Sequence, residues 1–114
     1  MREKIQAYSG QKQGELPATH LRLGEGLATV RAARLVWGEA IRTLERIGPA
    51  GPAAPVDERA AIRLAGAHVV RLANEAADGL AAAAGASSGF LASPLQRHLR
   101  DLQMMRGHVV FDWD

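Results

Sequence analysis

Two segments rich in glycine and proline divide the chain and restrict what it can fold into. The first is GPAGPAAP at residues 48–55, and the second is AAAGASSGFLAS at residues 82–93. Proline lacks a backbone N–H and glycine is costly in a helix, so both segments should interrupt regular structure. The stretches between them carry apolar residues at helical spacing. The sequence therefore predicts an all-α protein, an up-down bundle with helices over residues 17–47, 57–84 and 93–110.

The composition favours helices that pack through small side chains. Hydrophobic residues make up 47% of the 114 residues, but aromatic residues only 4%, and alanine is abundant. This length suffices for a single domain with a modest core. The net charge is +2 from interspersed acidic and basic residues, so no basic run indicates nucleic-acid binding.

The sequence gives little support for a metal site, a membrane span or a signal peptide. Cysteine is absent, and the four histidines are scattered without the spacing of a metal site, so we expect no metal ion. No apolar run approaches the roughly 18 residues of a membrane span. The start, MREKIQAYSG, lacks the apolar core of a signal peptide, so we expect a cytoplasmic protein without membrane contact.

The N-terminal residues raise the question of whether the chain is a piece of a longer protein. Residues 1–8 resemble the end of a helix, and SGQKQGE then breaks the pattern. A domain rarely begins with so short a helix, which favours a fragment. A flexible N-terminus is the alternative that this observation leaves open.

The segment 17–47 has more apolar surface than one neighbour would cover. Apolar residues at heptad-like spacing predict its packing seam. A second apolar edge includes Leu35, so we expect contacts on more than one side and a homo-oligomer, a dimer or a tetramer. Three helix-weakening glycines, at 24, 26 and 38, are explained either by close approach of another backbone or by a glycine-rich composition. The predicted seam consists of Leu23, Leu27, Val30, Trp37, Ile41 and Leu44.

The segment 57–84 has a seam of mostly small residues, which predicts a closely approaching partner helix. Asp57 is the expected N-cap, with Glu58 in the first turn. His68 lies beside the seam and is interpreted as a structural hydrogen-bonding residue. The seam consists of Ile62, Gly66, Val69, Ala73, Ala76, Leu80 and Ala83.

The last segment, SPLQRHLRDLQMMRGHVVFD, combines a strong helix start with a suggestive polar stripe. Ser93 and Gln96 fit a capping box around Pro94. One face carries the expected core residues, and the opposite face is either solvated or part of a site. The expected core residues are Leu95, Leu99, Leu102, Met105 and Val109. The opposite stripe contains Arg97, Asp101, Met104 and His108, at about 100° per residue.

The order of these elements resembles the C-terminal helical domain of the acyl-CoA dehydrogenase fold, over nearly the whole chain. LQRHLRD is similar to the arginine–aspartate motif at the start of that domain's last helix. AAGASSGF stands where dehydrogenases carry a glycine-rich turn that approaches the flavin. The dehydrogenases often have a catalytic glutamate a little over two turns after this motif. Here that position is Val109, which cannot accept a proton, and the nearest carboxylate is Asp112.

A histidine after the RxxRD pattern resembles instead the flavin-dependent monooxygenases of this fold, of the two-component hydroxyphenylacetate hydroxylase and dibenzothiophene monooxygenase type. The resemblance implies that His108 is catalytic and lies beside the flavin ring, where an imidazole can donate a hydrogen bond and transfer a proton near neutral pH. It implies cofactor-binding roles for Gly85, Ser87 and Ser88 near a flavin phosphate. Arg97 and Asp101 are expected to support the cofactor site.

The resemblance also implies cofactors and partners. The cofactor is FMN or FAD, delivered in reduced form by a separate flavin reductase, and the domain builds a homotetramer. Most of the flavin site belongs to domains that these residues do not include, so the chain alone should be inactive and bind flavin weakly. Two alternatives remain: an acyl-CoA dehydrogenase C-terminal domain with a displaced base, and a non-enzymatic helical interaction module.

Overall fold

The described part of the chain is built from two long antiparallel α-helices and one short α-helix. The computed structural model describes residues 16–85 and 93–111, and these residues contain no strand. Helix α1 (Pro17–Ile47) and helix α2 (Val56–Ala84) are joined by η2 (Gly48–Ala53), a 3-10 segment. The predicted all-α class is therefore confirmed.

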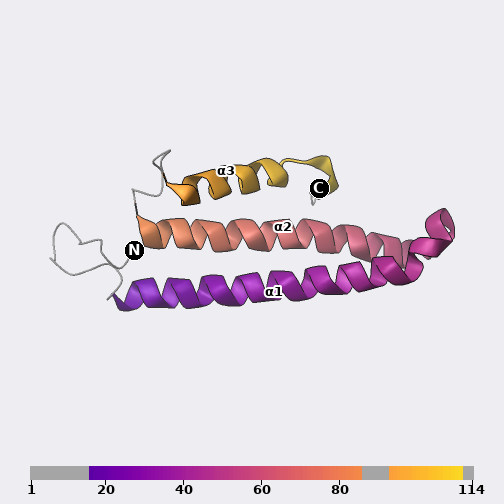
Figure 1. Cartoon of the computed structure of the whole chain (residues 1–114), viewed down its shortest axis with the longest axis horizontal. Helices are drawn as coiled ribbons and strands as arrows, with labels where there is room; N and C mark the ends of the chain where they lie inside the picture. The colour runs from indigo at the N-terminus through magenta and orange to yellow at the C-terminus, as the bar shows by residue number, and fades with distance from the viewer. Residues whose placement is uncertain (1–15, 86–92, 112–114) are drawn as a thin grey trace.

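The C-terminal part of the chain adds helix α3 (Pro94–Arg106) and the 3-10 turn η4 (Val109–Phe111). In Figure 1 the three α-helices lie side by side, with α2 in the middle and each helix antiparallel to its neighbour. Helix α2 packs against α1 on one side and against α3 and η4 on the other. The central helix consequently carries most of the core.

A column of mostly small residues forms the side of α1 that packs against α2. The buried positions recur at every seventh residue. The large apolar residues that were predicted to form the seam are mostly turned away, with Leu27 54% exposed and Trp37 48% exposed. That prediction is wrong because small side chains allow the two backbones to approach more closely than leucine and tryptophan would. The buried column consists of Thr19, Gly26, Ala33, Ala40 and Ile47.

The seam predicted for α2 does face its neighbours, because every one of its residues is buried or half-buried. Other small residues of α2, such as Ala67 and Ala77, are also buried. Burying alanine and glycine on several sides allows one helix to be packed between two others at close range.

The connection between α1 and α2 is short and sharply bent. Residues 48–53 form 3-10 turns on either side of Gly51, whose φ of 53° lies in the left-handed region that glycine adopts without strain. The N-cap of α2 is Pro55, so the expected cap, Asp57, is the second residue of the helix and does not cap it. An Arg46–Glu58 ion pair of 2.9 Å joins the two helix ends, and its hydrogen bond raises the pKa of Arg46.

The helix glycines differ in their surroundings. A Cβ added at Gly26 would lie 3.6 Å from Leu80, whereas one added at Gly24 would meet nothing within 4 Å. Gly38 lies near only the flexible Arg42 side chain. Gly26 is therefore the one of these three glycines that faces α2, but an added Cβ would make an ordinary van der Waals contact there, so close packing does not require glycine at any of the three positions. Where the chain is described, no helix is long and apolar enough to span a bilayer.

Candidate functional site

Helix α3 begins where the sequence predicted, but its N-terminus is capped differently. Ser93 is the N-cap and has extended backbone geometry, yet its side chain makes no capping hydrogen bond. The Gln96 N–H instead donates to the Ser93 carbonyl oxygen at 3.1 Å. Pro94 occupies the first turn, where a missing N–H costs nothing. The predicted capping box is therefore wrong, whereas the predicted start of the helix at Ser93 or Pro94 is confirmed.

The predicted polar stripe is solvent-exposed along α3. Arg97 Nε lies 3.8 Å from Asp101 Oδ2, and the two side chains are 77% and 56% exposed. The expected pairing of these residues is thus present but loose, and an exposed pair of this kind stabilises a helix little. Met104 beside it is 75% exposed. These side chains are available to a ligand or to another protein surface.

His108 does not continue that stripe, which corrects the predicted helix over residues 93–110. Helix α3 ends at Arg106, Gly107 is its C-cap, and His108 lies in a bend. Gly107 has φ of −82° and ψ of 1°, so the chain leaves the helical conformation at this residue without entering the left-handed region. The expected core face shortens accordingly. Leu95, Leu99 and Leu102 are half-buried, whereas Met105 and Val109 are exposed.

The bend that carries His108 is fixed against α2 by a group that we call the C-terminal clasp, formed by Arg63, Gly66 and Phe111. The Arg63 Nη2 donates to the Val109 carbonyl oxygen at 2.9 Å. The Phe111 ring packs over Gly66, where an added Cβ would lie 3.7 Å from ring carbons Cδ1 and Cε1. Within the turn, the Phe111 N–H donates to the His108 carbonyl oxygen at 2.8 Å.

The imidazole of His108 is itself held in a defined orientation. The Val110 N–H donates to Nδ1 at 3.2 Å. The Phe111 ring lies beside the imidazole, with centroids 5.9 Å apart and planes inclined by 51°. Because Nδ1 accepts a backbone N–H, it carries no proton, and the neutral ring has its proton on Nε2.

The predicted site residues do not meet in one pocket. Gly85 follows the end of α2 with a φ of 72°, and Arg97 lies in the first turn of α3, whereas His108 follows the end of that helix. The 13 residues of α3 place its two ends about 20 Å apart at about 1.5 Å per residue. Only an extended ligand could contact both ends. Ser87 and Ser88 lie outside the described residues.

Asn74 is a buried polar residue that the sequence reasoning missed. It is 6% exposed, and its Nδ2 donates to the Val70 carbonyl oxygen at 2.9 Å and to the Leu102 carbonyl oxygen at 3.1 Å. The second bond joins α2 to α3 directly. A lone amide within a seam of alanine and valine was the available signal, since buried polar groups almost always have partners.

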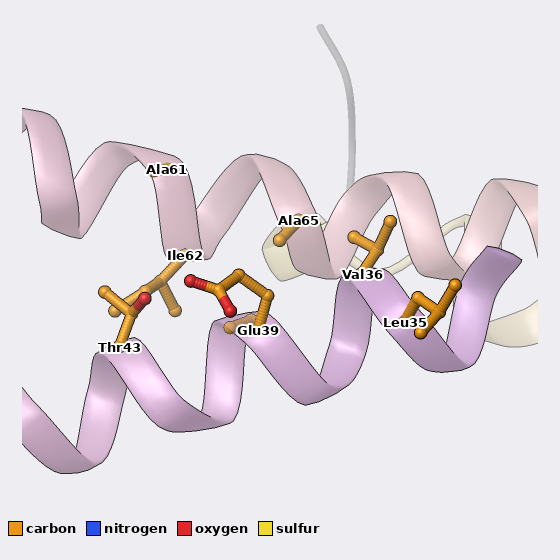
Figure 2. Close-up of a pocket in the computed structure, with 8 residues that line it drawn as sticks. Leu35, Val36, Glu39, Thr43, Ala61, Ile62 and Ala65 are labelled. Carbon is orange, nitrogen blue, oxygen red and sulfur yellow. The ribbon is translucent and has the colours of Figure 1, made fainter.

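An open apolar groove lies between α1 and α2. It encloses about 390 Å³, and Figure 2 shows Val36, Thr43 and Ile62 on its walls with the Glu39 carboxylate among them. Glu39 also pairs with Arg42 at 2.9 Å. The groove is too apolar to resemble a catalytic centre and fits a contact with another protein surface. No cluster of metal-ligating side chains occurs in residues 16–85 or 93–111.

Comparison with known families agrees with this architecture. Residues 1–113 match the family described as acyl-CoA dehydrogenase, C-terminal domain. The chain belongs to this family. The all-α arrangement of Figure 1 is consistent with this family.

One relative indicates a branch of the family. The chain is 34% identical over 114 residues to the p-hydroxyphenylacetate 3-hydroxylase oxygenase component of Acinetobacter baumannii. The match covers 99% of this chain but 27% of the relative, so the chain spans about a quarter of that protein's length. A comparison with solved structures gave no match.

Proposed function

We propose that this chain is the C-terminal helical domain of a flavin-dependent monooxygenase, the oxygenase component of a two-component system. The similarity to an oxygenase component and the histidine at position 108, one residue before the expected dehydrogenase base position, support this assignment. A separate reductase would supply the reduced flavin, FMN or FAD. The 27% coverage of the relative favours a longer protein, whose other domains would complete the flavin and substrate sites.

The donors on this chain fit the chemistry of a flavin. His108 offers an Nε2–H to ring acceptors, and the exposed Arg97 guanidinium is suited to an anionic phosphate. Asp101 would orient that guanidinium from beside it. When bound, reduced flavin would supply the activation of oxygen, while the protein contributes binding, orientation and a positioned proton.

The exposed apolar residues of α1 support an additional role in assembly. Leu23, Leu27, Val30, Trp37 and Leu44 are between 39% and 54% exposed, and the groove of Figure 2 lies elsewhere on the same pair of helices. Monomeric proteins rarely leave large contiguous apolar patches in water. We propose that these surfaces are covered by other copies of the protein in a dimer or tetramer.

The experiment that tests the catalytic role is His108→Ala in the oxygenase that contains this domain. Reduced flavin and p-hydroxyphenylacetate as the probe substrate are supplied, and hydrogen peroxide released is measured against hydroxylated product. Loss of a hydrogen bond to a strongly polarised group costs about 1.5–3 kcal/mol, so the ratio of peroxide to product should rise about ten- to a hundred-fold.

His98→Ala is the matched control, because His98 is also an exposed histidine but lies on α3 itself, away from the bend. It should leave the ratio unchanged. If His108→Ala also leaves the ratio unchanged while folding and flavin binding are intact, His108 has only a structural role and the assignment of the site fails.

A further inference from the structure

The bend at His108 is more firmly held than an exposed turn requires. Among residues 107–111, the described part of the segment after α3, none is buried, and His108, Val109 and Val110 are all exposed. Such a segment would ordinarily be among the first to open. Instead, η4 packs against α2 through the C-terminal clasp.

Each part of the clasp acts on a different atom around His108. The guanidinium of Arg63 holds the Val109 carbonyl, on the residue that follows the histidine. The Phe111 ring rests on Gly66 and lies against the imidazole. A larger residue at position 66 would occupy the space of that ring, since even a Cβ would already be in van der Waals contact with it.

The backbone fixed in this way determines the tautomer of the imidazole. Val110 lies between Val109, whose carbonyl oxygen accepts from Arg63, and Phe111, which packs on Gly66. The Val110 N–H donates to Nδ1 of His108. This bond requires the turn to keep its shape, because donor and acceptor are only two residues apart. Its consequence is a proton placed on Nε2, at the opposite edge of the ring.

We propose that the C-terminal clasp positions His108, holding its imidazole as the Nε2–H tautomer so that the ring meets the flavin as a hydrogen-bond donor. The inference rests on the proposed monooxygenase function. In this scheme Arg63, Gly66 and Phe111 are positioning residues, which act through His108 and touch neither flavin nor substrate. The clasp preorganises a donor that a free turn would present in several orientations.

The first experiment needs no cofactor and uses the 114-residue chain. Imidazole ¹⁵N spectra above the titration range of histidine report the tautomer of His108, and amide exchange reports protection of the Val110 N–H. The wild type should show well-separated Nδ1 and Nε2 resonances and a protected Val110 amide. In Arg63→Ala the two resonances should converge, and the amide should exchange about five-fold faster, as expected for loss of about one net hydrogen bond.

Matched variants separate positioning from general destabilisation. Arg59→Ala removes an exposed arginine one turn earlier on α2 and should change neither signal. Arg63→Lys retains a donor and should recover part of the protection. Gly66→Ala should behave as wild type, because its Cβ would make an ordinary contact, whereas Gly66→Leu should displace the ring and shift the resonances. Unchanged His108 resonances in both Arg63→Ala and Gly66→Leu would overturn the proposal.

The second experiment distinguishes this inference from the proposed function. In the oxygenase, Arg63→Ala should raise the ratio of peroxide to product in the same direction as His108→Ala, with Arg63→Lys partly restoring it. If His108→Ala changes the ratio but Arg63→Ala does not, the clasp does not position the histidine and the proposed function stands. If Arg63→Ala alters the tautomer but neither substitution alters the ratio, His108 is not catalytic and the proposed function fails.

Discussion

The amide of Asn74 should be the main polar attachment of α3 to the long helices. Helix α3 buries no residue of its own, and its apolar side chains are only half-covered. The Asn74 Nδ2 reaches across to the Leu102 carbonyl oxygen at 3.1 Å from a position that is 6% exposed. Removing this donor takes one hydrogen bond from the Leu102 carbonyl oxygen. Because the bond is part-buried, water replaces the lost donor only incompletely.

We predict that Asn74→Asp destabilises the chain by about 1–3 kcal/mol, the cost of leaving buried hydrogen-bonding groups unsatisfied. Aspartate has nearly the same size, so no cavity forms. When ionised, its oxygen atoms would face two carbonyl oxygens now 2.9 and 3.1 Å from the amide nitrogen. Asn74→Ala should lose a comparable amount through the missing bond and the emptied volume.

The assay combines thermal and urea unfolding with amide hydrogen exchange along the chain. A loss of this size should lower the melting temperature by roughly 4 °C per kcal/mol, and exchange in α3 should accelerate more than exchange in the middle of α1. Gln103→Ala, at an exposed position of α3, is the control and should change stability little. The reasoning is refuted if Asn74→Asp unfolds at the same urea concentration as wild type and α3 keeps its protection.

Three further predictions concern α1 and the cofactor. Gly24→Ala and Gly26→Ala should each stabilise the chain by about 1 kcal/mol in urea unfolding, since neither added Cβ meets a clash; a loss at Gly26 would show tighter packing against Leu80 than described. Wild-type protein should sediment as a dimer or tetramer at micromolar concentration, and Trp37→Glu should shift it toward monomer; a monomeric wild type would contradict the assembly role. Fluorescence titration of the chain alone with FMN and FAD should show no micromolar binding, and tight binding would mean that these residues hold a complete flavin site.

The sequence was sufficient for the three α-helices of residues 16–85 and 93–111, but not for the face of α1 that packs, and the helix end expected at residues 1–8 lies outside the described residues. Periodicity identified two apolar faces of α1, and the column that packs against α2 belongs to neither of them. Which face meets α2 depends on how closely two backbones can approach, and that depends on both helices together. The column containing Gly26, Ala33 and Ala40 packs against α2, in place of Leu27 and Trp37, because its small side chains match the small residues of the α2 seam.

The candidate site shows a different limit. The position of His108 around the helix axis was predicted by continuing 100° per residue through Gly107. A glycine after Arg106 is a common sign that a helix ends, and α3 does end there. The pairing of Arg97 with Asp101 was predictable because it depends only on helix geometry. The contacts of Asn74 and Arg63 were not, since each reaches 28 or 46 residues along the chain to a carbonyl whose position only the tertiary structure defines.

The seven-residue column of α1 has a consequence for helix register. A strictly repeating seam of small residues looks almost the same after one helix slides by a heptad, about 10 Å, along the other. Large interlocking side chains would resist such sliding, but this interface has few. The short η2 connection, with Gly51 in the left-handed region, therefore fixes which turns of α1 and α2 face each other. Lengthening that loop should release alternative alignments of the helix pair without changing any residue of the interface itself.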